Sequence, residues 1–402
     1  MNFNNGYSEE DKRKYKLNIF KSYIYYFILG IHTVRGVYYA YMTEWGGLTF
    51  SQQMVLQGYF MFMIFVFEIP SGAIADYMGR KKGLMFSALS VIIAAFLYSI
   101  IPNLLLFYLA ETFWAFSIAL ASGTEEALMY NSLKVSGEVE KLPKVMGNIQ
   151  MFNLIALTIS APLGSIIAEF VSLQFTMTLL GIIYIGAFIT SLTYHDPKIN
   201  YTKKSGSYLT IIKDGFKELR KNKILRILCF DRLFINIFVF FLFWTYQPYL
   251  KAVGVPLFIW GFILAFMNMI NALFSFLIPK ILKRVKRKLK LLILVDIIAG
   301  LSFISLGFTA NPFLGIGILF IIVAFGYPRF LLYTHGINNQ IESENRATVL
   351  STINMFGSLS MAILYPIIGF VVEVWSVFWF FIFDGIAILI FTTLTRVKND
   401  YL

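Results

Sequence analysis

Among the charged side chains inside the long apolar runs of this 402-residue chain, where a charge needs a partner, we select five as candidates for chemistry. A charged group at the centre of a lipid bilayer costs about 3 kcal/mol on insertion scales, so it must pair with another charge or face a watery cavity. A buried carboxylate can hold a proton, a cation or a solute in turn, which is chemistry that can link an ion gradient to solute movement. The five residues are Arg35, Glu111, Asp231, Arg232 and Arg329.

Two pairs among these residues lie at matching depths in their apolar runs. Arg35 and Glu111 each lie about eight residues from the outer end of their run, which at ~1.5 Å per residue is roughly 12 Å below that surface. Asp231 and Arg329 fall at similar depths in the opposite half of the membrane. The spacing therefore allows the pairs Arg35–Glu111 and Asp231–Arg329, and each can be a permanent structural link or a functional one.

The residue types that most enzymes and metal sites need are scarce. Cys229 is the only cysteine, which excludes an intrachain disulfide and a cysteine-based metal cluster. His32, His195 and His335 are far apart and form no HExxH pattern, and the sequence has no Walker A motif for ATP hydrolysis. We therefore expect no catalytic residue, no metal and no cofactor, and a membrane enzyme is a disfavoured alternative.

The composition requires lipid as the solvent around the chain. The sequence is 58% hydrophobic and 14% charged, with a mean hydropathy of +0.71, and a water-soluble fold of this length could not bury so much apolar surface. A helix that crosses a ~30 Å hydrocarbon core needs about 20 apolar residues. Segments of this kind predict twelve transmembrane helices, at 20–43, 52–75, 84–101, 104–128, 145–170, 174–194, 225–249, 258–282, 291–309, 313–337, 347–371 and 375–395.

Lysine and arginine are distributed asymmetrically between the predicted loops. With the amino terminus in the cytoplasm, nearly all of the 34 basic residues fall in the tails and loops on that side, and Lys251 alone falls outside. The net charge of +12 therefore follows the positive-inside rule and does not indicate a nucleic-acid-binding face. We predict a multi-pass protein of a bacterial cell membrane with both termini cytoplasmic.

The longest polar stretch, residues 195–224, separates six predicted helices from the six that follow. Within it, residues 208–223 alternate apolar and basic positions, which predicts either an amphipathic helix on the anionic inner leaflet or a solvated linker helix. The expected organisation is an amino-terminal bundle at 1–194, a linker at 195–224 and a carboxy-terminal bundle at 225–402.

A short charged turn connects the second and third predicted helices. Its residues Gly72, Asp76, Gly79, Arg80 and Lys81 combine small residues for close helix approach and a tight turn with charges that can form a polar latch. This spacing resembles the loop at the same place in the major facilitator superfamily. The resemblance implies that the loop is a gate that couples two halves of the protein at the cytoplasmic side.

The resemblance also implies an all-helical fold of two six-helix bundles that work by alternating access. In that family, helices 1, 4, 7 and 10 line a central cavity, whereas helices 9 and 12, with Asp296 and Asp384, are peripheral supports. Pro162 and Gly164 on the fifth helix resemble a signature of exporters, although a proline among small residues is common in membrane helices. Glu68, shortly before the charged turn, can relay protons or, as we favour, brace the turn.

The implied cavity helices and their neighbours carry aromatic, amide and imidazole side chains that could bind a solute. Those near helix ends can belong instead to the interfacial belt of the membrane. The candidates are His32, Tyr38, Tyr39, Asn236, Trp244, Gln247, Asn268, Asn271, Tyr327, Tyr333 and Asn354.

These features predict a secondary transporter for a small molecule, driven by an ion gradient that we expect to be one of protons. The fifth-helix pattern and the aromatic side chains favour an antiporter that exports amphipathic compounds such as drugs. The alternative is uptake or exchange of a polar or anionic metabolite, such as a sugar or an organic anion, for which Arg35, Arg232 and Arg329 are suited. We expect a monomer in the lipid bilayer, with no nucleic-acid partner.

Overall fold

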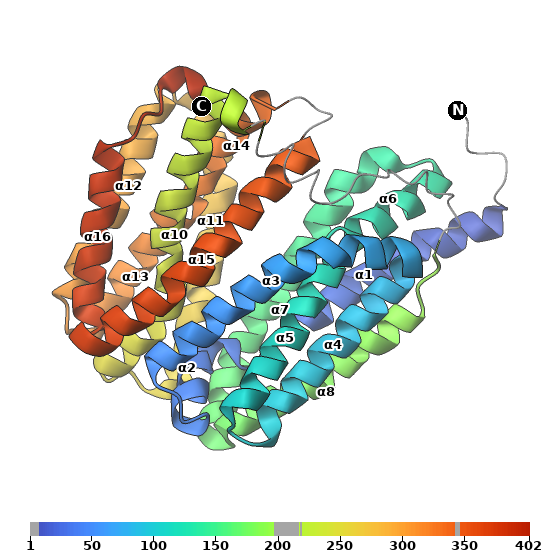
Figure 1. The fold of residues 1–402 in the computed structure, drawn as a ribbon, viewed down its shortest axis with the longest axis horizontal. Coiled ribbons are helices and arrows are strands. Elements are labelled where there is room, and N and C mark those ends of the chain that lie inside the picture. Colours follow the sequence, from blue (N-terminus) through green and yellow to red (C-terminus); the bar gives the residue numbers. More distant parts are fainter. Residues whose placement is uncertain (1–7, 197–216, 218, 342–345) are drawn as a thin grey trace. The chain divides into compact units, whose positions relative to one another are not determined.

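Every regular element in the described part of the chain is a helix (Figure 1). The computed structural model describes residues 8–196, 217, 219–341 and 346–402, and of residues 69–77, 335, 346–348, 350 and 351 it describes the backbone alone. The chain divides into two compact units. The first comprises Met1–Leu48 and Leu56–Lys204, and the second comprises Thr49–Val55 and Ser205–Leu402.

The helices of the first unit are long and mostly apolar, and α3 has its first residues in the second unit. In chain order they are α1 (Glu9–Gly30), η2 (Arg35–Val37), α2 (Tyr38–Ala40), η3 (Tyr41–Trp45), α3 (Phe50–Met78), α4 (Arg80–Ile100), α5 (Leu104–Ala121), α6 (Thr124–Ser136), η4 (Val139–Lys141), α7 (Leu142–Phe170) and α8 (Leu173–Leu192). Helix α4 packs against α5 and α8, and α1 packs against α7. Tyr41, Tyr98 and Phe107 are fully or almost fully buried at the centre of this packing.

The second unit has the same helical character. Its elements are α10 (Lys223–Ala252), α11 (Leu257–Arg284), α12 (Lys288–Gly307), α13 (Pro312–Gly326), η5 (Tyr327–Arg329), α14 (Phe330–Asn339), α15 (Arg346–Trp375), α16 (Val377–Thr393) and η6 (Asn399–Tyr401). Helix α12 packs along α16 and α13, and α10 packs against α16 and α14. The backbones of α12 and α16 approach closely, because a Cβ added to Gly385 would lie 2.5 Å from the carbonyl oxygen of Gly300.

Ten segments of the described chain are long and apolar enough to cross a membrane, so this is a multi-pass membrane protein. The predicted count of twelve is not confirmed. The first predicted span is not among the ten because its helix α1 ends at Gly30 and begins with charged turns. Helix α16 is apolar but has only 17 residues, which is fewer than the other spans have.

Three of the segments that the sequence predicts as continuous helices are broken in the structure. The first is interrupted between Gly30 and Arg35, and the fourth is interrupted at Gly123, which has a φ of +71°. The tenth passes through a 3-10 turn, η5, that contains Pro328. Hydropathy cannot detect these breaks, because an average over the length of a span combines the few residues at each break with the apolar residues on both sides of it.

The turn between α3 and α4 is built on Gly79. Its φ of +89° lies in a region that favours glycine, and it directly precedes α4. A carboxylate does face this turn, but it belongs to Asp196, which accepts a hydrogen bond from the backbone N–H of Lys81 (3.3 Å). Gly72 and Asp76 belong to the stretch described by its backbone alone, so the latch predicted for Asp76 remains a prediction.

The helix predicted at 208–223 falls largely outside the described residues, so both interpretations of it stay open. Within the described residues, Asn222 marks the start of α10. Its side chain accepts hydrogen bonds from the backbone N–H groups of Ile224 and Leu225 (3.0 and 3.1 Å). This is the geometry of a helix N-cap.

Candidate functional site: a buried charge cluster in each unit

Arg329, at the end of η5, is the centre of a buried charge cluster in the second unit. The residue is 0% exposed. Its Nη2 donates a hydrogen bond to Asp231 on α10 (2.9 Å). Its Nε and Nη2 also donate to the two carboxylate oxygens of Asp296 on α12. The pair Asp231–Arg329 that the spacing allows is therefore present, as part of a larger cluster.

Asp296 is the member of this cluster for which the family resemblance implies a peripheral, supporting helix. Its side chain is 3% exposed and makes a two-point ion pair with Arg329. Helix α12 lies directly against α13, the helix that leads into η5, so a carboxylate on α12 can reach Arg329. One signal in the sequence does indicate a partner: an aspartate in the middle of an apolar run needs a cation to offset its desolvation.

Hydroxyl groups complete the surroundings of Asp231. Tyr333, one turn after Arg329, accepts a hydrogen bond from Arg329 Nη2 and donates one to Asp231 Oδ1. Thr395, just beyond α16, donates to Asp231 Oδ2. Two carboxylates therefore share one guanidinium, and with all three groups ionised the cluster carries a net charge of −1. One proton can neutralise it without removing the cation.

The break in the tenth predicted helix places Arg329 inside the unit. Pro328 has no backbone N–H, so a regular helical hydrogen bond is missing at this turn, and the chain passes through η5 before α14 begins. The guanidinium is not saturated, because its Nη1 is buried without a hydrogen-bond partner among the described residues. A discontinuous helix with an unsatisfied donor is a feature that transporters use to bind solutes.

Glu111 on α5 is the centre of the corresponding cluster in the first unit. It is 4% exposed. Its Oε1 accepts hydrogen bonds from Gln57 on α3 (2.6 Å), from the hydroxyl of Tyr98 on α4 and, more weakly, from Tyr38 on α2 (3.4 Å). Gln57 also donates to the Tyr38 hydroxyl (2.9 Å). All of these donors are neutral, so a proton on this carboxylate has no cation to displace.

The ion pair Arg35–Glu111 that the spacing allows is not among the ion pairs of the described residues. Matching depths would bring Arg35 to Glu111 only if Arg35 lay on a continuous helix. Instead, Arg35 lies in the 3-10 turn η2, after the break that follows Gly30, so its direction differs from that of a regular helix. Gln57 and Tyr98, which are not among the predicted site residues, take the place of the arginine.

The break in the first helix is held by α7 and α8. The backbone N–H of His32 donates to Ser160 Oγ (2.9 Å), and Thr33 Oγ1 donates to the carbonyl oxygen of Thr176 (2.6 Å). A Cβ added to Gly164 would lie 1.7 Å from the carbonyl oxygen of Thr33. Gly164 therefore allows the close approach of α7 to the broken segment, next to Pro162 inside that helix.

His32 and Arg35 lie side by side in this broken segment. The His32 ring packs on Trp114 of α5, with ring centroids 5.5 Å apart. Its Nδ1 is buried and has no hydrogen-bond partner among the described residues. The first unit thus has the same two features as the second, a helix break with an unsatisfied polar group and a buried carboxylate.

The remaining predicted site residues do not form one cluster. Arg232 packs its guanidinium over the Phe330 ring (5.8 Å), and Gln247 donates to the Tyr246 hydroxyl (2.7 Å). Trp244 packs edge-on against Tyr365. Among the others, Asn354 is exposed, and the rest are partly buried: Glu68, Tyr39, Asn236, Asn268, Asn271 and Tyr327.

Groups of acidic, histidine and cysteine side chains that could hold a metal ion are missing from the described part of the chain. Asp384 on α16 is a separate case. Both of its carboxylate oxygens are buried, and neither has a hydrogen-bond partner within the described residues. It does not belong to either cluster.

Comparison with known proteins agrees with the fold. A sequence profile of the Major Facilitator Superfamily matches residues 20–334, which is more than three quarters of the chain. The chain belongs to the Major Facilitator Superfamily. As a superfamily member it is a membrane transporter and not an enzyme. Among curated protein sequences, none is similar enough to count as a match.

Solved structures of superfamily transporters have the same fold as this chain. A mutant of the nucleoside transporter NupG matches with a TM-score of 0.78 at 14% identity, over 96% of this chain and 98% of the other. NupG without that mutation gives 0.76 at 15% identity, over 96% and 100%. A D-xylose-proton symporter gives 0.71 at 14% identity, over 96% and 98%. At these identities the likeness establishes the fold alone.

Proposed function

We propose that this superfamily member is a secondary transporter that moves a small polar solute across the cell membrane, coupled to protons. The observation that carries the proposal is the Asp231–Arg329–Asp296 cluster at a helix break. In this proposal the chain forms two six-helix bundles, twelve spans in all, with both termini in the cytoplasm. Alternating access of the two bundles moves the solute.

Asp231 is the proton carrier in this proposal. Asp296 holds Arg329 through two hydrogen bonds, whereas Asp231 shares only Nη2 of the guanidinium and is otherwise held by hydroxyl groups. Its side chain is also more exposed, at 9% against 3% for Asp296. A proton can therefore reach Asp231 and weaken its hold on Arg329 while Asp296 keeps the cation in place.

The released guanidinium then offers hydrogen bonds to a solute. Arg329 already has one unsatisfied donor, Nη1, and loss of the Asp231 contact frees part of Nη2. Hydroxyl, carbonyl or carboxylate groups accept such bonds, and a polar solute carries more of these groups than a lipophilic compound does. This chemistry couples protonation of Asp231 to solute binding at the helix break.

Glu111 is a second proton site in this proposal. Its donors are neutral, so a proton would replace one hydrogen-bond pattern with another without loss of an ion pair. The adjacent break carries Arg35 and His32, which supply polar groups in the first unit. Each unit would then contribute one carboxylate and one broken helix to the transport cycle.

Export of amphipathic drugs, the function that the fifth-helix pattern favours, gains no support from the comparisons. The solved structures with the same fold include those of a nucleoside transporter and of a D-xylose-proton symporter. Pro162 and Gly164 also have a structural explanation in the close packing of α7 on the broken first helix. We therefore propose import of a hydroxyl-rich solute, such as a nucleoside or a sugar, over drug export by antiport.

A transport assay with purified protein in liposomes tests this proposal. Radiolabelled nucleosides, pentoses, hexoses and organic anions are each offered with and without an inward proton gradient. We expect one class to accumulate only with the gradient, and a protonophore to abolish the accumulation. Movement of lipophilic dyes with no movement of any polar solute would reject the proposal.

A further inference from the structure

Helix α10 carries a ridge of side chains with a groove on each side. Arg226, Phe230 and Phe234 follow one another at intervals of one turn, and all three line both grooves. Phe230 is 56% exposed and Phe234 is 43% exposed, and their stacked rings have centroids 6.3 Å apart. The ridge therefore separates two apolar spaces that share their charged end.

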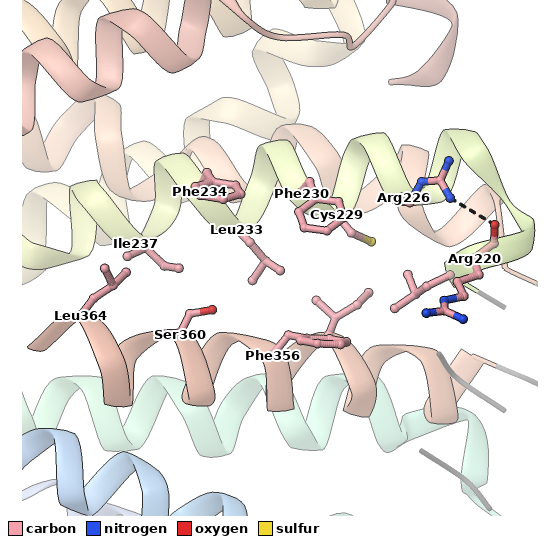
Figure 2. A pocket seen from close by; sticks show the side chains of 12 residues that line it. Arg220, Arg226, Cys229, Phe230, Leu233, Phe234, Ile237, Phe356, Ser360 and Leu364 are labelled. Carbon is pink, nitrogen blue, oxygen red and sulfur yellow. Dashed lines mark hydrogen bonds between the residues drawn. The ribbon is translucent and has the colours of Figure 1, made fainter. Parts of the chain in front are cut away.

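The first groove lies between α10 and α15 and has a volume of about 390 Å³ (Figure 2). Leu233 and Ile237 line it from α10, and Phe356 and Leu364 line it from α15. Ser360 is a single small polar residue midway along the α15 side (Figure 2). An arginine pair closes one end of the groove, where Arg226 Nη1 donates to the backbone carbonyl of Arg220 (3.2 Å).

The second groove lies between α10 and the end of α16 and has a volume of about 350 Å³. Phe391 and Leu394 form its apolar wall on the α16 side, and Phe391 stacks on Phe234 with centroids 4.9 Å apart. Its charged end is formed by three exposed basic side chains. These are Lys223, Arg226 and Arg396.

We propose that one anionic phospholipid binds this surface, with its phosphate at Lys223, Arg226 and Arg396 and one acyl chain in each groove. A single apolar ligand would need one groove, whereas two grooves that meet at a cationic end match two chains that meet at a phosphate. None of the three cations has a carboxylate within ion-pair distance among the described residues. An anionic headgroup would therefore gain their charge without competition.

The lipid would lie against the charge cluster of the same unit. Asp231 and Thr395 line the second groove, and both are already hydrogen-bonded within the cluster. A bound phosphate would therefore alter the field at Asp231 without replacing its partners. The two grooves and the three cations make up the lipid site, which would bind lipid whichever solute the protein carries.

Binding of defined lipids to the detergent-purified protein tests the headgroup. Phosphatidylglycerol and phosphatidylcholine with identical chains are compared by native mass spectrometry. We expect phosphatidylglycerol to bind more tightly, and Arg226→Gln to reduce that preference about fivefold, since a basic residue near an anionic lipid contributes about 1 kcal/mol. The triple variant K223Q/R226Q/R396Q should abolish the preference.

The control for charge alone is K283Q/R284Q/K286Q, which removes three exposed basic residues outside the grooves. It should keep the wild-type preference. Two results would overturn the proposal. One is equal binding of the two lipids by the wild type. The other is an equal loss of the preference for phosphatidylglycerol in the two triple variants, which would indicate only a general attraction to a basic surface.

A second measurement tests the acyl chains. Diacyl phosphatidylglycerol should raise the melting temperature of the protein more than its single-chain lyso form at equal phosphate concentration, because only the diacyl form fills both grooves. Ser360→Phe, which fills the groove between α10 and α15, should remove this difference while leaving stabilisation by the lyso form. Equal stabilisation by both forms in the wild type would contradict a two-groove lipid site.

Discussion

Asp296 and Arg329 form a two-point ion pair between α12 and η5, and both side chains are at most 3% exposed. The pair joins two elements. One is α12, a helix predicted to be a peripheral support, and the other is η5, the break in a helix predicted to line the cavity. The pair therefore fixes the position of the one guanidinium that also reaches Asp231.

Removing the cation should destabilise the second unit strongly. Arg329→Met leaves two buried carboxylates without their cation, and breaking a buried ion pair costs about 3–5 kcal/mol. Arg329→Lys keeps the charge but loses the two-point geometry, so its loss should be smaller. Circular dichroism of the purified variants during unfolding in detergent measures the loss of stability in each. Equal stability of the wild type and Arg329→Met would show that the cluster is not a structural link.

Glu111→Gln should separate proton binding from folding. The amide oxygen can still accept hydrogen bonds from Gln57 and Tyr98, so unfolding free energy should change by less than about 1.5 kcal/mol. Because an amide does not titrate, the dependence of solute uptake on pH should become flatter. Tyr98→Phe is the control, since it removes a hydrogen bond and keeps the carboxylate. A wild-type pH profile in Glu111→Gln would assign Glu111 a structural role only.

Gly164→Ala should prevent correct packing of the first unit. The added methyl group would lie 1.7 Å from the carbonyl oxygen of Thr33, so α7 and the broken helix would have to separate. We expect a loss of at least about 3 kcal/mol, at the upper end of the cost of overpacking. Gly147→Ala in the same helix is the matched control, because nothing lies within 4 Å of its added Cβ. Similar yields and melting temperatures for the two variants would contradict the packing described.

Asp384→Leu should stabilise the protein. Both carboxylate oxygens are buried and lack hydrogen-bond partners among the described residues, and such a group costs about 1–3 kcal/mol. An apolar side chain of similar size removes that cost. A higher melting temperature with unchanged transport is the expected result. Lost transport in a stable Asp384→Leu protein would show that this carboxylate takes part in function.

The helical membrane fold is predictable from the sequence, because long apolar runs and the placement of basic residues report on the bilayer directly. The contact of Asp231 with Arg329 is predictable from depth, because the break at Arg329 is a single 3-10 turn that joins α13 directly to α14, so the depth of Arg329 changes little. Depth also allows the pair Arg35–Glu111, which is not among the ion pairs of the described residues. The first helix would have to be continuous for the two side chains to meet, and it is broken after Gly30. A break such as that after Gly30 depends on hydrogen bonds that its residues donate to Ser160 and Thr176, which are far away in the sequence.

Asp296 and Gln57 show a second limit of the sequence. Which face of an apolar helix points inward depends on its neighbours, and almost every position of α12 is apolar enough to face lipid or protein. A polar residue in such a helix indicates only that some partner exists. The structure supplies the partner, Arg329 for Asp296 and Glu111 for Gln57.

Transport by Asp231→Asn in liposomes tests the central proposal most directly. Solute exchange at equal pH on both sides and uptake driven by a proton gradient are measured with the same protein. We expect the variant to keep exchange, because the amide oxygen can still accept hydrogen bonds from Arg329 and Tyr333 while its NH2 group donates to the Thr395 hydroxyl, and to lose gradient-driven accumulation, because an amide does not titrate. Accumulation equal to that of the wild type under the same gradient would show that Asp231 does not carry the coupling proton.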